Sequence, residues 1–525
     1  MSVTMGGSLT KWKHLVHNGV AFPPLYEPKR LHIIINGEKV PLSPDAEELA
    51  YAWGKKRTTP YVQDPVFQTN FLSDLSKLLP SKFANVKYSD IDFGPVYEHQ
   101  QKEELLRADK DLKKRLAAQR KELRLQLKEK YGYATIDGTK TEFANYMVEP
   151  PSIFMGRGSH PMRGRWKPRT FPEDVVLNLS EDASVPAPPI PGNWKNVAHD
   201  HESIWLAYWV DKLSQVRKYV WPSDVSDLRQ ERDKMKYENA NKLRRKLADV
   251  RLFIKKNLSS SDIKARKLAA VSYLIDNLAM RVGDEKEEDE ADTVGASTLR
   301  VEHVKFLPNG VGFDFLGKDS VRWEKTLELD GADSPIRRNL QEFISGKKPE
   351  DLVFDGITSE GVNRFLGKAM RGLTAKVFRT HHATDTVQTY LARHNEFKPD
   401  DPPFVKLYHA RVANLEAAIR CNHKRTPPKT WQNSLDKKQQ RLAELKTRQS
   451  KTDKQKLRLE ERREKLELDV KLQRRTRDYN LNTSLRNYID PRVYKSWANK
   501  AEFDWTSIYP KTLQRKFLWA TKSKA

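Results

Sequence analysis

The stretch QNSLDKKQQRLAELKTRQSKTDKQKLRLEERREKLELDVKLQRR, residues 432–475, has the most regular pattern in the chain. Its apolar residues fall at helical spacing in two narrow seams, which the segment SKTD (450–453) separates. The seams consist of Leu435, Leu442 and Leu445, and of Leu459, Leu466 and Val470. This pattern predicts two antiparallel helices paired through a coiled-coil-like seam. Their length and charge favour an arm that projects from the protein.

The whole chain, at 525 residues, is too long for one compact core. We expect an α+β, multidomain and mostly helical fold, in which helices dominate from about 227 to 283 and from about 335 to 430. The expected domains are an N-terminal lobe (1–220), a hinge (221–233), a helical core subdomain (234–430), a coiled-coil linker (431–476) and a C-terminal domain (477–525).

Three local patterns predict elements within these domains. Residues 97–131 are highly charged and contain no Pro or Gly, so we expect one long helix with a thin apolar stripe. The segment HIIINGEKV (32–40) predicts a β-hairpin that turns at Asn36-Gly37. Alternating apolar residues over 297–323 predict strands joined by tight turns.

The composition points to a polyanionic partner. The chain has 95 Lys and Arg against 70 Asp and Glu, a net charge of +25, and nucleic acid is the first candidate for such an excess. Cys421 is its single cysteine, which excludes an intrachain disulfide framework and favours a reducing, intracellular location. No run of about 18 apolar residues predicts a membrane span, and the N-terminus lacks the apolar region of a secretory signal.

Two kinds of ligand site are considered and rejected. In GFDFLGKDS (312–320), the spacing of Gly312, Gly317 and Lys318 approaches that of a phosphate-binding P-loop, but Asp319 replaces the required Ser or Thr. What remains is a lysine at a turn, where a solvated side chain is the simpler alternative. The acidic run 284–292 lacks the alternation of a calcium loop. Cys421 with His423, and His381 with His382, lack the further ligands of a zinc site, so we expect no metal site.

Several basic or aromatic residues are candidates for a site, although each also has an ordinary structural explanation. In GRGSHPMRGRWKPR (156–169), Arg157, Arg165 and other cations alternate with glycines, which suits phosphate binding and fits a solvated basic loop equally well. Arg281 follows an apolar helix and could simply stabilise its C-terminus. Tyr488, in TSLRNYIDP (483–491), could simply pack its ring in a core. The remaining candidates are Lys376 and Arg379 in GLTAKVFRTHHATDT and His423, Lys424 and Arg425 in IRCNHKRTPPKT.

Together these motifs establish a resemblance that none of them carries alone. In order along the chain they are KWKHLVHNGVAFPPLYEP, GRGSHPMRG, MRVGDEKEEDEADTVG, LRVEHV, FDFLGKDS, LTAKVFRT, CNHKRTPPKT and NYIDPR. Over nearly its whole length the chain resembles eukaryotic-type DNA topoisomerase I, the type IB enzyme. It lacks the family's charged N-terminal extension, which suits either an archaeal member or a shortened eukaryotic one. It reads Ser-Leu-Arg-Asn-Tyr where the family has Ser-Lys-Leu-Asn-Tyr, which leaves the role of Arg486 open.

The resemblance implies a role for each candidate residue. Tyr488 is the expected nucleophile, and Arg281, Arg379, His423 and Lys318 complete the expected catalytic set, with Lys318 as general acid. The expected DNA-binding residues are Arg157, Arg165, Asp319, Lys376, Lys424, Arg425 and Asn487. Arg157 and Asp319 also match the place where the family's camptothecin-type poisons bind.

The function implied is relaxation of positive and negative supercoils through a transient 3′-phosphotyrosine, without ATP or an essential divalent metal. A bilobed clamp closes around double-stranded DNA in this family, and its helical catalytic subdomain is related to tyrosine recombinases. We therefore expect a monomer associated with the chromosome, in the nucleoid or cytoplasm if archaeal and in the nucleus if eukaryotic. Two alternatives remain, a tyrosine recombinase-like strand transferase and a non-catalytic DNA-binding scaffold.

Overall fold

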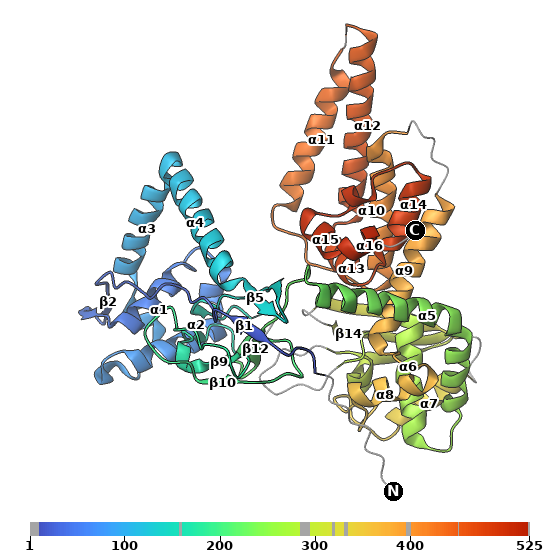
Figure 1. The fold of residues 1–525 in the computed structure, drawn as a ribbon, viewed down its shortest axis with the longest axis horizontal. Coiled ribbons are helices and arrows are strands. Elements are labelled where there is room, and N and C mark those ends of the chain that lie inside the picture. Colours follow the sequence, from blue (N-terminus) through green and yellow to red (C-terminus); the bar gives the residue numbers. More distant parts are fainter. Residues whose placement is uncertain are drawn as a thin grey trace. The chain divides into compact units, whose positions relative to one another are not determined.

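A computed structural model describes residues 10–156, 160–283, 294–317, 321–329, 334–394, 401–449 and 451–522. The chain forms two compact units, one up to Arg229 and one from Gln230 onward (Figure 1). The expected α+β, mostly helical composition is confirmed. No helix in the described ranges is long and apolar enough to cross a membrane.

The first core of the N-terminal unit packs helices against a small sheet. The sheet has the order β3-β2-β4, with β2 at His32–Ile35, β3 at Glu38–Pro41 and β4 at Ile91–Asp92. The helices against it are α1 (Pro44–Gly54), α2 (Pro65–Leu75) and α3 (Gly94–Ala108). Trp53 stacks on Phe71 at 3.9 Å between ring centroids, and both are fully buried. The predicted hairpin is confirmed, since Asn36 and Gly37 both have the positive φ angles that its two-residue turn requires.

The second core of this unit lies between two further sheets. One has the order β1-β5-β6, and the other has the order β10-β9-β11-β12. Their strands are β1 (Leu15–His17), β5 (Tyr133–Ile136), β6 (Thr139–Glu142), β9 (Val175–Asn178), β10 (Asn196–Ala198), β11 (Ala207–Val210) and β12 (Arg217–Val220). A separate ribbon pairs β7 (Ser152–Ile153) with β8 (Trp166–Lys167).

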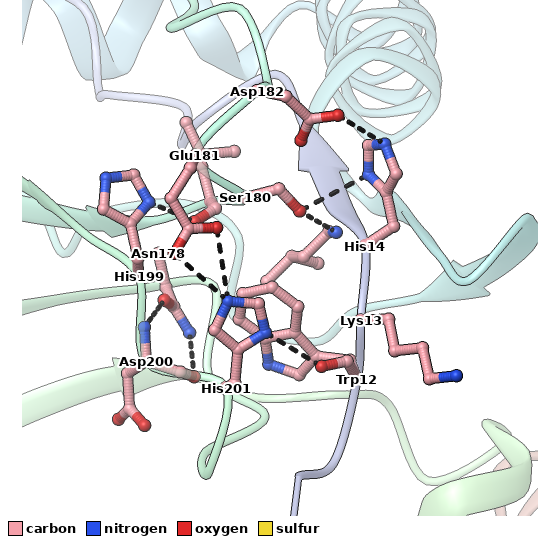
Figure 2. Close-up of polar contacts among 12 residues, drawn as sticks. Trp12, Lys13, His14, Asn178, Ser180, Glu181, Asp182, His199, Asp200 and His201 are labelled. Atoms are coloured by element: carbon pink, nitrogen blue, oxygen red, sulfur yellow. Dashed lines mark hydrogen bonds and ion pairs between the residues drawn. The ribbon is translucent and has the colours of Figure 1, made fainter.

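A polar network joins β1 to the segment after β9, as Figure 2 shows. The Leu15 amide donates to Ser180 Oγ at 2.6 Å, Ser180 Oγ lies 3.3 Å from His14 Nδ1, and His14 Nε2 lies 3.2 Å from Asp182. This serine–histidine–aspartate series has the order of a catalytic triad. Ser180 is only 2% exposed and its oxygen already binds a backbone amide, so we assign the network a structural role.

The expected single helix over 97–131 is wrong. Two helices, α3 and α4 (Lys110–Tyr131), occupy this range and are separated at Asp109. The Asp109 carboxylate accepts hydrogen bonds from the amides of Asp111 and Leu112, both at 2.8 Å, and so caps α4. Aspartate stabilises a helix start better than a helix interior, which explains the break. The predicted apolar stripe is only partly buried: Leu105 and Leu123 are exposed, and Leu112, Leu116 and Leu127 are half-buried.

The first core of the second unit packs helices against an antiparallel meander. The strands are β13 (Val304–Leu307), β14 (Gly310–Gly317) and β15 (Val321–Glu328), in that order. The helices are α5 (Asp227–Leu258), α6 (Ile263–Leu278), α7 (Pro335–Ile344) and α8 (Ser359–Ala369). The prediction of strands within 297–323 is confirmed, although short 3-10 turns occupy Ala296–Thr298 and Val301–His303.

The second core of this unit is entirely helical. It is formed by α9 (Ala375–Arg393), α10 (Pro403–Arg420), α13 (Leu481–Asn487), α14 (Pro491–Lys500), α15 (Lys511–Lys516) and α16 (Leu518–Lys522). Tyr237 of α5, Tyr494 and Phe517 are its largest fully buried side chains. Because α9 begins in the first core and ends in the second, its middle turns lie where the two cores meet.

The predicted helix pair is present as α11 (Trp431–Thr447) and α12 (Asp453–Arg475), which we call the arm. Figure 1 shows the two helices side by side, extending away from the rest of their unit. Arg463 of α12 donates to the carbonyls of Leu445, Lys446 and Arg448 at 2.8–3.1 Å, so it satisfies the free C-terminal end of α11. At the base of the arm, Leu472 is buried against two side chains of α10.

Candidate active site

Arg379 lies at the centre of the site, on α9. Its side chain is 3% exposed, and its guanidinium donates to the Ala279 carbonyl and, at 3.0 Å, to the Cys421 carbonyl. A third contact joins Arg379 Nη2 to His423 Nε2 at 3.1 Å. One arginine therefore connects the segment after α6 with the segment after α10.

Arg281 reaches the site because α6 ends in an unusual backbone conformation. Ala279 has a φ of 53°, in the left-handed region that costs a residue with a Cβ about 1 kcal/mol or more. This turn directs the following chain away from the helix. The Arg281 carbonyl then accepts a hydrogen bond from the Ala296 amide at 2.8 Å. A Cβ on Gly295 would lie 2.3 Å from the backbone of Gly283, so the two strands of chain approach as only glycine permits.

His423 follows α10 and is held by backbone hydrogen bonds on both sides. Its amide donates to the Ala418 carbonyl at 2.8 Å, and its carbonyl accepts from the Asn480 amide at 2.7 Å. The second bond brings the chain back from the arm to the site. Burial, together with the charges of Arg379 and Arg281, lowers the pKa of His423 to about 2. The imidazole is therefore neutral at physiological pH.

Tyr488 ends α13 and is fixed through its own backbone. Its amide donates to the Ser484 carbonyl at 2.9 Å, and its carbonyl accepts from the Thr384 hydroxyl of α9 at 3.1 Å. The same hydroxyl accepts from the Asp490 amide at 3.1 Å, and the buried Asp490 carboxylate caps α14. These contacts hold Tyr488 against α9, the helix that carries Arg379.

The ring of Tyr488 packs against the basic side chains. Its centroid lies 5.2 Å from that of His423 and 5.1 Å from Cζ of Arg379. Burial alone would raise the pKa of the hydroxyl. The charges of Arg379 and Arg281, with a smaller contribution from Lys376, outweigh burial and hold the pKa of Tyr488 below its usual value near 10. The site therefore makes the phenolate of Tyr488 easier to form than that of an ordinary tyrosine.

Two donors of the site have no partner among the described residues. They are Arg379 Nε and His423 Nδ1, and both are buried. Because Nε2 of the neutral imidazole faces an arginine donor, we assign the imidazole proton to Nδ1. Buried N–H groups are normally paired, so these two donors, together with the nearby guanidinium of Arg281, fit an anion with several oxygens. A small cavity of about 30 Å³ is lined by Arg281, Arg379, Trp323 and Asn422 among others.

A largely buried ion network connects α9, the helix of Arg379, to two neighbouring helices. Asp276 of α6 accepts from Arg251 at 2.7 Å and lies 3.0 Å from Nε2 of His382, which is three residues beyond Arg379 on α9. Burial opposes ionisation of this carboxyl, but His382 and Arg251 prevail and lower the pKa of Asp276 to about 2. The network thus joins α5, α6 and α9 with an ionised carboxylate.

The structure brings together four of the five residues expected to be catalytic, namely Tyr488, Arg281, Arg379 and His423. Lys318, Arg157 and Asp319 lie outside the described residues. Lys376 is exposed on α9, and Asn487 directs its amide to the Thr483 carbonyl at 3.2 Å. Lys424 is partly exposed and pairs with Tyr479 through backbone, whereas the Arg425 side chain is exposed. Arg165, in the other unit, is ion-paired with Asp74 at 2.9 Å.

Lys325 is the functional candidate that sequence reasoning missed. It lies on β15 beside the site, and its Nζ binds two backbone carbonyls at helix ends. A signal was available, because the strand VRWEKTLE (321–328) alternates and places Lys325 on the inward face with Trp323 and Leu327. A lysine on the buried face of a strand is unusual enough to mark a special role.

Comparison with known proteins covers both units. The family model for the DNA-binding fragment of eukaryotic DNA topoisomerase I matches residues 10–222, and that for its catalytic core matches residues 225–456. A C-terminal topoisomerase domain model matches residues 460–525.

Individual relatives give the same answer. DNA topoisomerase 1 beta of Arabidopsis thaliana is 35% identical over 99% of this chain, which spans 59% of the plant protein. DNA topoisomerase 1 of Homo sapiens is 36% identical over 97% of the chain, which spans 71% of the human protein. A tyrosine among buried cations, in a chain matched from end to end by these models, leads to one conclusion: the chain belongs to the eukaryotic DNA topoisomerase I family of isomerases.

Proposed function

We propose that this protein is a type IB DNA topoisomerase, which relaxes positive and negative supercoils by transient cleavage of one strand. The observation that carries the proposal is the position of Tyr488. Its hydroxyl has a lowered pKa and lies among Arg281, Arg379 and His423, where two buried donors await an anion. A scissile phosphodiester has the oxygens that this arrangement fits.

In the proposed reaction, Tyr488 Oη loses its proton to solvent and attacks the phosphorus. The bond from phosphorus to the 5′ oxygen breaks, which leaves a 3′-phosphotyrosine and a 5′-hydroxyl. Negative charge grows on the non-bridging oxygens as phosphorus becomes five-coordinate. The guanidiniums of Arg281 and Arg379 and the Nδ1 proton of His423 stabilise this charge without a metal ion.

Lys318 is the proposed general acid for the departing 5′ oxygen. Such proton transfer contributes about 10²–10⁴-fold to a rate. The phosphotyrosine is itself a phosphodiester, so its bond energy is retained and religation requires no ATP. Rotation of the free duplex end between cleavage and religation relaxes the supercoils.

Binding of double-stranded DNA would be directed mainly at phosphates. The net charge of +25 supports weak sequence preference and a steep dependence on salt. We propose that Lys376, Lys424, Arg425 and Asn487 line the DNA near the cut, together with Arg157 and Asp319. Arg165 would contact DNA by exchanging its bond to Asp74 for a phosphate. The family relationship favours a monomer that acts on chromosomes in the nucleus.

Two larger movements are proposed on the same basis. Opening at a hinge near Pro222 would admit DNA between two lobes of a clamp. The arm, as a coiled-coil linker over the downstream duplex, would slow the rotation. Deletion of residues 432–475 should then change the relaxation rate and the processivity, and an unchanged rate and processivity would contradict a braking role.

The test of the proposed function is relaxation of a supercoiled plasmid in EDTA without ATP. We expect the wild-type protein to relax it and the Tyr488→Phe variant to bind DNA without relaxing it. Tyr479→Phe is the matched control, because Tyr479 is a nearby half-buried tyrosine whose pKa is raised by burial rather than lowered by cations. We expect this variant to be fully active.

The other outcomes separate the alternatives. Activity retained by Tyr488→Phe would refute the mechanism. Activity only on a plasmid with a particular recognition sequence would favour a recombinase-like strand transferase, which shares the Arg, His and Tyr chemistry. Plasmid binding without relaxation by the wild-type protein would favour a scaffold.

A further inference from the structure

Lys325 connects the C-terminal ends of two helices. Its Nζ donates to the Arg420 carbonyl at 2.7 Å and to the Leu278 carbonyl at 3.2 Å. These are the last residues of α10 and α6. Carbonyls at a helix C-terminus lack partners within the helix and carry the negative end of its dipole, so an ammonium is well suited to bind them.

Both helix ends lead directly to the active site. Arg281 follows Leu278 by three residues, and His423 follows Arg420 by three residues. Arg379 binds the next carbonyl in each segment, those of Ala279 and Cys421. Lys325 and Arg379 therefore join the same two segments at consecutive positions. Arg420 adds a third link, since it donates to the Asn277 carbonyl at 3.0 Å.

The environment of Lys325 is otherwise unfavourable for a cation. Burial and then the charge of Arg420, with smaller contributions from Arg379 and Lys424, outweigh an opposing contribution from Cys421 and lower the pKa of the ammonium to about 8. Among the described residues no carboxylate pairs with it, and the Trp323 ring lies 5.6 Å from Nζ. The two carbonyl bonds are thus what holds this charge in place.

We propose that Lys325 is a positioning residue of the active site: by joining the ends of α6 and α10 it fixes the separation between Arg281 and His423. The inference rests on the proposed function, in which the Arg281 and His423 side chains contact the same phosphate. The separation between these side chains matters for that reason. Misplacement of a reacting group by about 1 Å costs about 10²-fold in rate. Loss of the Lys325 contacts, which lie three residues before Arg281 and His423, can therefore slow the reaction markedly.

The first test measures chemistry separately from binding. Single-turnover cleavage of a suicide DNA substrate at saturating protein is compared for Lys325→Met, Lys325→Arg and Lys264→Met. Lys264→Met removes the same charge at the exposed start of α6, far along that helix from Arg281. We expect Lys325→Met to cleave about 10- to 100-fold more slowly with unchanged DNA affinity. We expect Lys325→Arg to recover most of the rate and Lys264→Met to match wild type.

The pH profile of cleavage distinguishes positioning from simple stability. Tyr488 is faced by Arg379 and Lys376 from α9, by Arg281 and by the neutral His423. If Arg281 moves away in Lys325→Met, the midpoint of the profile should rise towards the ordinary tyrosine value. Loss of stability alone would lower the melting temperature without moving that midpoint. A wild-type cleavage rate in Lys325→Met, or an unshifted profile, would overturn the proposal.

Hydrogen exchange of the DNA-free protein tests the bridge without reference to activity. We expect amides of residues 279–283 and 421–425 to exchange faster in Lys325→Met than in wild type or Lys264→Met. Unchanged exchange in both segments would refute the bridge even if the enzyme is active. Conversely, a wild-type protein that forms no covalent DNA adduct would refute the proposed function, and the exchange result would still decide whether Lys325 joins the two segments.

Discussion

The basic loop at residues 160–169 of the first unit and the active site of the second unit are both rich in cations, but these cations are neutralised differently. Every Arg and Lys of the loop pairs with a carboxylate, and the pairs are Arg163–Asp64, Arg165–Asp74, Lys167–Asp211 and Arg169–Glu48. Among the described residues of the site, Arg379 and Lys325 pair with no carboxylate and instead contact backbone carbonyls, a neutral histidine and aromatic rings. Ion pairs with carboxylates hold the loop in place and neutralise its charge. Cations without carboxylate partners leave their positive charge uncompensated, which favours the binding of an anion.

The difference also appears in the pKa values. Asp64 and Asp211 have lowered pKa values because their cationic partners favour the charged carboxylates. In the site, burial and mutual repulsion lower the pKa of Arg281, Lys325 and His423 instead. Repulsion of this kind opposes folding and is relieved when an anion binds. A cluster of cations that lower one another's pKa is therefore a better indicator of a site than the number of basic residues.

The largest expected effect comes from changing the arginine fork at the centre of the site. Arg379→Lys keeps the charge but cannot bind two carbonyls and a phosphate in the plane of a guanidinium. We expect single-turnover cleavage to fall about 10²–10³-fold with little loss of DNA affinity. Arg163→Lys makes the same replacement in the basic loop and should leave the cleavage rate unchanged. Equal effects of the two substitutions on cleavage would remove the distinction between the regions.

Arg163→Met should affect stability rather than chemistry. Its guanidinium binds Asp64 through two hydrogen bonds at 2.6 and 3.1 Å, and Asp64 in turn caps α2. Loss of this charge-assisted pair should destabilise the loop and α2 by about 2 kcal/mol. Native-state hydrogen exchange of α2 and α9 measures this, and only α2 should exchange faster. A slower cleavage rate with unchanged exchange in α2 would show that Arg163 acts on DNA.

Each unit contains a buried neutral histidine, and the effect of pH on the two units can be compared. Burial lowers the pKa of His17, in the first unit, to about 4, although its ring bonds Asn178 and Gly19. Its folded pKa lies below the unfolded value near 6.5, so its contribution to stability is complete above pH 6.5 and is lost as the pH falls towards 4. Between pH 7 and 5 this amounts to about 2 kcal/mol.

We expect denaturation of a His17→Gln variant to show a correspondingly smaller loss of stability between pH 7 and 5 than wild type. The cleavage rate per folded molecule should not fall over this range through His423, whose pKa is lower still because cations surround it. An equal acid sensitivity of variant and wild type would contradict the buried, neutral state of His17.

The smallest effect is expected in the arm, where a cation also binds helix-end carbonyls but in contact with solvent. Arg463→Ala removes the contacts to the end of α11 and should cost about 0.3–1 kcal/mol. Amide hydrogen exchange near Leu445 monitors the fraying of α11 and so measures the effect. Arg462→Ala is the control, because Arg462 is an exposed neighbour. A larger loss in the control would refute the capping role.

Much of the fold could be predicted because it depends on local pattern. The arm follows from leucine spacing, and the Asn36-Gly37 turn follows from backbone preference. The break at Asp109 could not be predicted, because an aspartate in a charged run is equally compatible with a helix interior. The resemblance named the residues of the site, and the fold brings four of them together.

Contacts between residues that are far apart in the chain could not be predicted from the sequence. Arg163 meets Asp64, 99 residues earlier in the chain, so the basic loop gives no sign that its charges are already neutralised. The two carbonyls that Lys325 binds are 47 and 95 residues away. Every residue has a backbone carbonyl, so a contact to a carbonyl does not require a particular residue type. Such a contact therefore produces no recognisable sequence motif. Only the inward position of Lys325 on an alternating strand marked it.

The central claim is that the cations of the second unit prepare Tyr488 to attack a phosphodiester, and a trapped covalent adduct tests this most directly. The protein is incubated with a suicide DNA substrate, digested with protease and nuclease, and the residue that retains nucleotide is located by mass spectrometry. We expect a 3′-phosphate ester on Tyr488 and on no other residue. An adduct on a different side chain, or bound DNA with no adduct, would contradict it.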